Sequence, residues 1–209
     1  MKKVQNKHLF YRKTNDGEKM NVFDFDGTIY HGDSSFDFFR FCLRKYPKTI
    51  LNLPRCLFFG ALYGLRIVKK ITFKQKFFAM VKHIDDIDTA VERFWDEKEK
   101  KIHKWYLNMK APTDVIISAS PEFLLEPICK RLGVGKLMAS RTDKHTGIFD
   151  GKNCHGEEKV VRFRSLFPNA EVNEFYSDLY CDTPMARIAK KAYIVKGEKL
   201  TPWKESKLK

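Results

Sequence analysis

Short apolar runs alternate along the chain with longer helix-like segments. The apolar runs predict strands over residues 20–25, 114–118, 136–140, 172–176 and 192–195. Helices are expected after three of these strands, over residues 122–132, 157–167 and 184–191. Strands that alternate with helices indicate an α/β fold built on a parallel sheet. In such a sheet the ligand site lies at the C-terminal ends of the strands.

One long segment does not follow this alternation. Residues 33–110 contain few β-like runs and are expected to be mostly helical, so we interpret them as a helical cap inserted after the first strand. The α/β core then consists of residues 20–32 and 111–195. A basic N-terminal extension (1–19) and a basic C-terminal tail (196–209) are expected to be loose and exposed to solvent.

The composition excludes some classes of protein and favours others. Hydrophobic residues make up 43% of the 209 positions, which is enough for a packed core and excludes a disordered chain. The net charge of +14 favours an anionic partner, which is nucleic acid, an acidic membrane surface or a phosphorylated substrate. Half of this charge lies in the two terminal segments, and no nucleic-acid-binding motif is present. A basic nucleic-acid-binding protein is therefore the alternative of another class, and no nucleic acid is expected as a partner.

The cysteines indicate a reducing compartment. They are five in number, form no Cys-x-x-Cys pair and follow no secretory signal, so we interpret them as reduced thiols of a cytoplasmic protein. The six histidines show no metal-ligand spacing, which argues against zinc. The longest apolar and glycine run, residues 56–65, is too short for a transmembrane helix, which needs about 20 residues.

Two carboxylates stand at the end of the first predicted strand, in the motif Asp24-Phe25-Asp26-Gly27-Thr28. Burying them side by side is costly unless a cation or a proton lies between them. Gly27 permits a tight turn and lets main-chain N–H groups approach an anion. Taken alone, the Asp-x-Asp pattern is also consistent with an acidic turn after a strand.

Further candidate groups follow the later strands. Ser118 ends an apolar strand, where a hydroxyl suits phosphate oxygens, although an isolated serine more often caps a helix. Lys159 opens a predicted helix; it either neutralises a phosphate or is solvated, as single lysines usually are. Asp178 is placed to join Asp24 around a hard cation, for which Mg²⁺ is the natural choice. The alternative is an acidic loop in which Asp182 caps the next helix.

In this order, the four motifs resemble those of the haloacid dehalogenase-like (HAD) phosphohydrolase superfamily, over about residues 20–195. The position of the cap resembles subfamily IB, which contains phosphoserine phosphatase. A closer likeness is to bacterial phosphatidylglycerophosphate phosphatases of the same subfamily. It lies in Phe23-Asp24-Phe25-Asp26-Gly27-Thr28, Ser118-Ala119-Ser120-Pro121, Cys154-His155-Gly156-Glu157-Glu158-Lys159-Val160 and Tyr176-Ser177-Asp178. The resemblance implies a Rossmann-like parallel sheet with an inserted helical cap.

The resemblance also implies a phosphatase that hydrolyses a phosphomonoester through an aspartyl-phosphate intermediate. Asp24 would be the nucleophile and Asp26 the acid and base. Asp24, the main-chain carbonyl of Asp26 and Asp178 would hold Mg²⁺. The phosphate would be bound by Gly27, Thr28, Ser118, Ala119 and Lys159, while Asp182 would support the metal site or Lys159. Leu179 departs from the fourth motif, which often has serine there, without affecting Asp178 as a ligand.

The cap combines positive charge with an apolar stretch. Residues 38–84 contain eleven Lys or Arg and no acidic residue, and they surround the apolar residues 57–65. This pattern suits peripheral contact with the inner, anionic face of a membrane. A cap at the membrane surface would fit a membrane lipid phosphate as substrate, and the resemblance described above implies phosphatidylglycerophosphate. The alternative is a cap that packs on itself, over a small soluble substrate such as phosphoserine or a sugar phosphate. Asp33 is expected to cap a helix over 34–43. The alternative, which the resemblance to phosphoserine phosphatase implies, is that Asp33 contacts an amine of the substrate.

Overall fold

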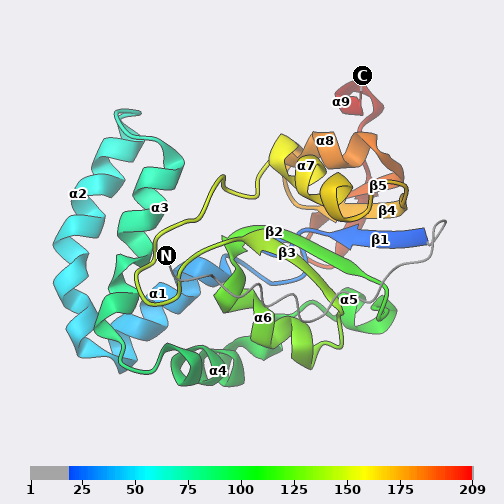
Figure 1. The fold of residues 1–209 in the computed structure, drawn as a ribbon. Helices are drawn as coiled ribbons and strands as arrows, with labels where there is room; N and C mark the ends of the chain where they lie inside the picture. Colours follow the sequence, from blue (N-terminus) through cyan, green and yellow to red (C-terminus); the bar gives the residue numbers. More distant parts are fainter. Residues whose placement is uncertain (1–18, 209) are drawn as a thin grey trace, which may run out of the picture.

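A six-stranded sheet forms the centre of the computed structural model, which describes residues 19–208. The strand order is β3-β2-β1-β4-β5-β6; the first five strands are parallel and β6 is antiparallel to β5 (Figure 1). The α/β class predicted from the sequence is therefore confirmed. The strands are β1 (Lys19–Phe23), β2 (Val115–Pro121), β3 (Lys136–Ser140), β4 (Glu171–Ser177), β5 (Ala189–Lys196) and β6 (Lys199–Pro202).

Helices cover both faces of this sheet. Ile116 of β2 packs with Leu124 of α6 (Glu122–Arg131), whereas its neighbours Val115 and Ile117 pack on the opposite face. There they meet α7 (Glu157–Leu166) and α8 (Thr183–Arg187), which Figure 1 shows above the sheet. Alternate residues of a strand point to opposite faces, so these continuous apolar runs are buried on both sides.

Two expectations for the C-terminal third are wrong. The helix expected over 184–191 ends at Arg187, because residues from Ala189 onwards pair with β4 as β5. The expected loose tail instead forms β6 and the short helix α9 (Glu205–Leu208). Trp203 between them is buried and packs against Phe175 with tilted rings, so ladder hydrogen bonds and a buried indole outweigh the basic composition. Of the expected N-terminal extension, residues 1–18 lie outside the described residues, and Lys19 belongs to β1.

Helices occupy the chain between β1 and β2. Asp33 caps α1 as predicted, since its carboxylate accepts a hydrogen bond from the N–H of Phe36. Phe38 of α1, Trp95 of α4 and Tyr106 of α5 share one apolar cluster with Phe23 of β1, so these helices and the sheet have a common core. The helices are α1 (Ser34–Lys45), α2 (Leu53–Gly64), α3 (Lys70–Phe78), α4 (Ile87–Lys98) and α5 (Lys104–Met109). Short 3₁₀ helices also lie in this segment, at Pro47–Asn52, Ala79–His83 and Glu99–Lys101, and a further one at Tyr180–Asp182 follows β4.

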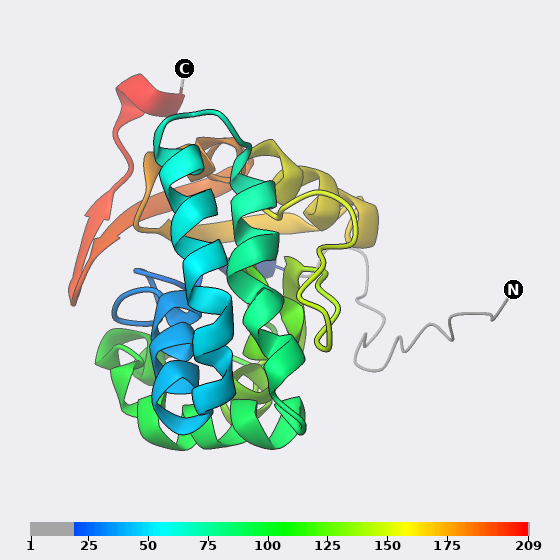
Figure 2. The ribbon, with the colours of Figure 1, turned by 90° about the vertical axis from the view of Figure 1, so that its left-hand side faces the viewer.

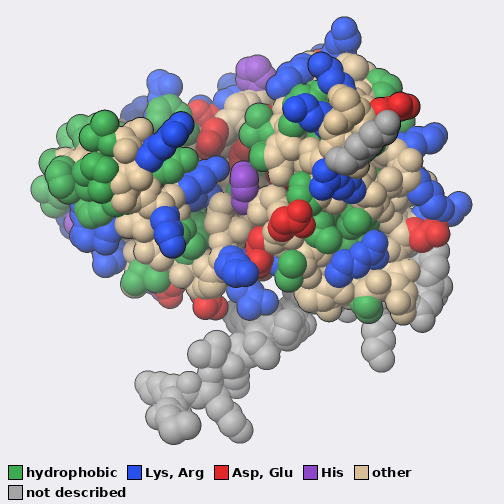
Figure 3. All heavy atoms as spheres, turned by 90° about the horizontal axis from the view of Figure 1, so that it is seen from above, with side chains coloured by type: hydrophobic (Ala, Val, Ile, Leu, Met, Phe, Trp, Pro, Cys, Tyr) green, Lys and Arg blue, Asp and Glu red, His purple; other side chains and the backbone are tan. Residues whose placement is uncertain are grey.

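Helices α2 and α3 project from this body as an antiparallel pair, the α2–α3 hairpin, residues 53–78 (Figure 2). Its outer face is apolar: Leu57, Phe58, Leu65 and Ile67 are each at least 60% exposed. Figure 3 shows hydrophobic side chains gathered at this end of the molecule, with Lys and Arg side chains beside them. Within residues 19–208 no helix has the length and apolar character that crossing a bilayer requires. The five cysteines are free thiols, as predicted.

Candidate active site

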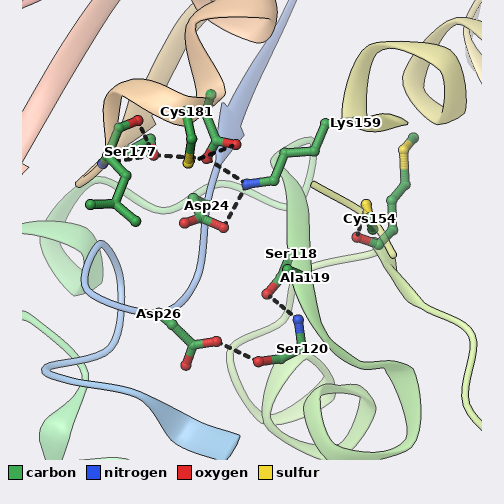
Figure 4. Close-up of polar contacts among 12 residues, drawn as sticks. Asp24, Asp26, Ser118, Ala119, Ser120, Cys154, Lys159, Ser177 and Cys181 are labelled. Carbon is green, nitrogen blue, oxygen red and sulfur yellow. Dashed lines mark hydrogen bonds and ion pairs between the residues drawn. The ribbon is translucent and has the colours of Figure 1, made fainter. Parts of the chain in front are cut away.

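Three neighbouring strands bring the sequence motifs to one edge of the sheet (Figure 4). Strand β1 leads into Asp24 and Asp26, β2 carries Ser118 and Ala119, and β4 leads into Asp178. Because β1 lies between β2 and β4, and Phe23 is in register with both Ile116 and Tyr176, the ends of these strands converge. This is the edge at which parallel α/β sheets bind ligands.

Lys159 lies at the centre of this edge although it is on a helix. It occupies the first turn of α7, is 1% exposed, and donates hydrogen bonds to Asp24 Oδ1 at 2.8 Å and to Asp182 Oδ2 at 2.7 Å. Burial alone would lower the pKa of Lys159, but the carboxylates of Asp24 and Asp182 reverse this and hold it above the ordinary lysine value. A charged ammonium group is therefore fixed beside Asp24, and the alternative of a solvated lysine is wrong.

The side chain of Asp182 binds Lys159 and does not cap a helix. It occupies the N-cap position of α8, but its side chain makes no capping hydrogen bond. Instead its Oδ2 accepts from Lys159 and, at 2.9 Å, from the hydroxyl of Ser177. Of the roles weighed from the sequence, the structure supports contact with Lys159.

A main-chain hydrogen bond fixes Asp24 at the end of β1. Its N–H donates to the carbonyl of Tyr176 at 2.9 Å, which ties it to β4. Burial raises the pKa of Asp24 to about 7, against the opposing effect of the Lys159 ammonium group. Its carboxylate therefore lies in a water-poor site with a fixed cationic partner, so the alternative of an exposed acidic turn is wrong.

The carboxylate of Asp26 accepts hydrogen bonds from two donors, in Ser34 and Ser120. Oδ1 accepts from the N–H of Ser34 at 2.6 Å, and Oδ2 accepts from the hydroxyl of Ser120 at 2.5 Å. Burial raises the pKa of Asp26 to about 6, and the nearby Asp33 carboxylate acts in the same direction. A carboxyl group with a pKa near 6 exchanges its proton readily at neutral pH. Sequence reasoning assigned no role to Ser120, although its place two residues after Ser118 on the same strand was a usable signal.

Gly27 makes room for Asp178. Its φ is +73°, and a Cβ built there would lie 2.3 Å from Oδ2 of Asp178. The N–H of Gly27 donates to the carbonyls of Tyr30 and Gly32, so it stabilises the turn; this corrects the expectation that it faces a phosphate. The glycine is required here because any side chain would displace the carboxylate.

The site fits a cation held by oxygen ligands. Oδ1 of Asp178 is buried and has no hydrogen-bond partner among the described residues, and burial raises the pKa of this carboxyl group. A buried carboxylate oxygen without a donor is consistent with a hard cation. No group of three or more His, Cys, Asp or Glu side chains in residues 19–208 could hold a metal by itself. A cation at Asp178 and Asp24 would therefore also need main-chain, water or phosphate oxygens.

The remaining predicted residues lie at the same edge. Ser118 is 1% exposed, and its Oγ accepts from the N–H of Ser120 at 3.1 Å, so it does not cap α6. Thr28 is fully buried, and no described residue is a hydrogen-bond partner for its hydroxyl oxygen. The carbonyl of Ala119 accepts from the hydroxyl of Ser140 at 2.9 Å, which fixes the main chain of this segment.

A lysine that the motifs do not include joins the site. Lys74 of α3 donates to the carbonyl of Ala119 at 2.7 Å and to Oδ1 of Asn153 at 3.2 Å. Burial lowers the pKa of Lys74 to about 8, and the charge of Lys70 acts in the same direction. In the sequence it is one of eleven basic residues in 38–84 with nothing to distinguish it. Only the packing of α3 against the strand ends singles it out.

Comparisons of the sequence with known proteins agree with this geometry. A family model described as haloacid dehalogenase-like hydrolase matches residues 22–187. Protein CicA of Caulobacter vibrioides, found in two strains, is 36% identical over 106 residues. That alignment covers 48% of this chain and 42% of CicA, so the match spans less than half the length of these curated relatives.

Solved structures share the fold. A protein of unknown function from Bordetella pertussis Tohama I has a TM-score of 0.71 at 17% identity, over 84% of this chain and 89% of that chain. A phosphoserine phosphohydrolase-like protein from Francisella tularensis subsp. tularensis SCHU S4 has a TM-score of 0.53 at 14% identity, over 84% and 86%. At these identities the likeness concerns the arrangement of helices and strands.

Proposed function

Because this chain belongs to the haloacid dehalogenase-like hydrolases, we propose that it is a phosphatase that hydrolyses a phosphomonoester through an aspartyl-phosphate. The observation that carries the proposal is the hydrogen bond of 2.8 Å between the buried Lys159 and Asp24. In this proposal Asp24 is the nucleophile and Lys159 is the cation that neutralises the phosphate, and the hydrogen bond between them supports both roles. Asp26, with its raised pKa, adds the acid and base.

In the proposed reaction Asp24 attacks phosphorus through a carboxylate oxygen, and the bond between phosphorus and the ester oxygen breaks. Asp26 gives its proton to that leaving oxygen. A water molecule then attacks the phosphorus of the aspartyl-phosphate and gives a proton to Asp26. The bond between phosphorus and the Asp24 oxygen breaks, so that inorganic phosphate leaves and the Asp24 carboxylate is restored. Lys159, the hydroxyl of Ser118 and the N–H of Ala119 hold the phosphate oxygens as charge develops on them.

The cofactor we propose is Mg²⁺. Asp24, the main-chain carbonyl of Asp26 and Asp178 would hold it, and the unpartnered Oδ1 of Asp178 supports this assignment. When bound, the cation supplies positive charge that offsets the charges of the phosphate and the nucleophile.

A membrane lipid phosphate, such as phosphatidylglycerophosphate, is the substrate class we propose. The support is the apolar outer face of the α2–α3 hairpin, where Leu57, Phe58, Leu65 and Ile67 are exposed. Arg55 and Arg66 are exposed on the same segment. An apolar helical surface with basic side chains around it adsorbs to anionic bilayers, with about 1 kcal/mol from each basic residue near the surface. The enzyme would then meet its substrate as a peripheral protein.

The test is Mg²⁺-dependent phosphate release from phosphatidylglycerophosphate in mixed micelles, with phosphoserine and an aryl phosphate in parallel. We expect release from the lipid, abolished by EDTA and by Asp24→Asn but retained in Asp150→Asn, which changes an exposed aspartate. Release from phosphoserine or the aryl phosphate without release from the lipid would reject the lipid assignment and keep the chemistry. Release from none of the three would reject the phosphatase.

A further inference from the structure

A cavity of about 490 Å³ opens between α1, α2 and α3. Most of its wall is apolar, with Phe39 from α1, Cys56 and Gly60 from α2, and Phe73 and Phe77 from α3. Phe73 and Phe77 line the cavity and are only partly buried. Its volume lies in the range of about 300–1,000 Å³ that is typical of sites for small molecules.

One end of this cavity borders the candidate active site. Ser35 lines the cavity and lies 2.9 Å from Ser120, whose hydroxyl donates to Asp26. Lys74 also lines it and donates to the carbonyl of Ala119, next to Ser118. The cavity wall is therefore in direct contact with Ser120, which binds Asp26, and with Ala119 of the proposed phosphate site.

The charge in the cavity is confined to a few residues. Among the residues that line it, only Asp33, Lys70 and Lys74 are charged, and Lys70 and Lys74 are one turn apart on α3. The rest of the wall offers carbon and a few small polar groups. A ligand that fits this distribution has an anionic head and a hydrocarbon tail.

The cavity also reaches the apolar outer face of the hairpin. Leu57 lines it and is 64% exposed, so the same side chain belongs to the wall and to the surface that we propose meets a bilayer. A hydrocarbon chain has a continuous apolar route along this side chain from that surface into the cavity.

We propose that the cavity between α1, α2 and α3 binds the hydrocarbon chain of an amphiphilic phosphomonoester whose phosphate lies at Asp24. This inference rests on the proposed function and adds to it the site that selects the substrate by the length of its chain. Each methylene group that enters an apolar site strengthens binding by up to about fourfold. The preference for long chains therefore ends when the cavity is full.

The test is a series of n-alkyl phosphates, from butyl to decyl, assayed as monomers without detergent. In the wild-type protein we expect kcat/KM to increase about two- to fourfold per methylene up to a plateau. Gly60→Leu places a side chain in the cavity, because a Cβ added at this position would lie 3.4 Å from the ring of Phe73. It should lower kcat/KM for decyl phosphate at least tenfold and leave butyl phosphate within twofold.

Gly64→Leu is the matched control, because it makes the same change on the same helix at a position with nothing within 4 Å of the Cβ and outside the cavity wall. It should keep the dependence on chain length. Ala61→Phe, also in the cavity wall, provides a second obstruction if Gly60→Leu does not fold.

Binding of decylphosphonate, measured by calorimetry, gives a readout besides activity. We expect weaker binding in Gly60→Leu than in Gly64→Leu. Hydrolysis that does not depend on chain length in the wild-type protein would overturn the inference and leave the proposed function intact. An equal loss of kcat/KM for decyl phosphate in Gly60→Leu and Gly64→Leu would also overturn the inference. If no phosphate is released from any substrate, the proposed function fails, and the decylphosphonate measurement still decides whether the cavity binds a chain.

Discussion

Lys74 on α3 donates a hydrogen bond of 2.7 Å to the main-chain carbonyl of Ala119 on β2. The bond joins the projecting α2–α3 hairpin to the strand end that carries Ser118. Because burial keeps water away from this ammonium group, the carbonyl of Ala119 and the amide oxygen of Asn153 replace its hydration. The position of the hairpin over the strand ends is therefore coupled to the geometry of the proposed phosphate site.

Removing this link should loosen the hairpin. We expect Lys74→Met to raise KM about tenfold or more, because a hydrogen bond from a charged donor contributes about 1.5–3 kcal/mol. Amide hydrogen exchange in residues 70–78 should become faster at the same time. Lys82→Met, which changes an exposed lysine, should alter neither. Unchanged exchange in α3 would show that the hairpin is held without Lys74.

Replacing Lys159 should destabilise the fold. Lys159→Met leaves the buried carboxylates of Asp24 and Asp182 without their cation, and breaking a buried ion pair costs about 3–5 kcal/mol. Urea unfolding at pH 7.5 measures this loss. In the double variant Lys159→Met/Asp182→Asn the loss should be smaller, because one of the two carboxylates is then neutral. Additive effects of the two substitutions would contradict the coupling.

Asp26 should make stability depend on pH. Its pKa is about 6 in the folded state against an ordinary 3.8, so the folded state retains its proton longer. The unfolding free energy should therefore fall as pH rises from about 4 to about 6, by about 3 kcal/mol, and this contribution should stay constant above that range. In EDTA, Asp26→Asn should raise the melting temperature at pH 7.5 and have no effect near pH 4. Asp150→Asn, at an exposed position, should leave the dependence of the unfolding free energy on pH unchanged.

Gly27→Ala should weaken Mg²⁺ binding. The added Cβ would lie 2.3 Å from Oδ2 of Asp178, so the carboxylate must move, and we expect at least a tenfold loss of Mg²⁺ affinity by calorimetry. Gly133→Ala is the matched control, since Gly133 has the same φ of +73° and nothing within 4 Å. Both variants should lose about 1 kcal/mol of stability from the backbone alone. Equal Mg²⁺ affinity in the two variants would argue against Asp178 as a ligand.

The C-terminal segment should contribute to stability. Trp203 is 4% exposed and packs near Phe175 and Tyr180. Trp203→Ala should cost about 3–5 kcal/mol in thermal or urea unfolding. Lys204→Ala, at an exposed neighbouring position, should change stability by less than about 0.5 kcal/mol. A small effect of Trp203→Ala would mean that the segment is as loose as its composition suggested.

The expectation for residues 196–209 failed for a physical reason. Five lysines against two glutamates predict a solvated segment, and these lysines are indeed compatible with an edge strand, whose side chains stay in water. Composition does not show that the main chain of Lys199–Pro202 pairs with the free edge of β5. Pairing between strands depends on which edge is free, and that is a property of the assembled sheet.

Local patterns along the chain were enough to predict the strand–helix alternation, to recognise the family and to give the order of the polar groups after the strands. These features are local: Asp24, Ser118 and Asp178 each lie within or just after a strand, and the C-terminal ends of parallel strands meet at one edge. Further contacts are visible only in the folded molecule. Lys159 reaches both Asp24 and Asp182, Ser120 binds Asp26, and Lys74 donates to the carbonyl of Ala119. These contacts join residues up to 135 positions apart, so they depend on how helices pack against the sheet, which no local pattern encodes.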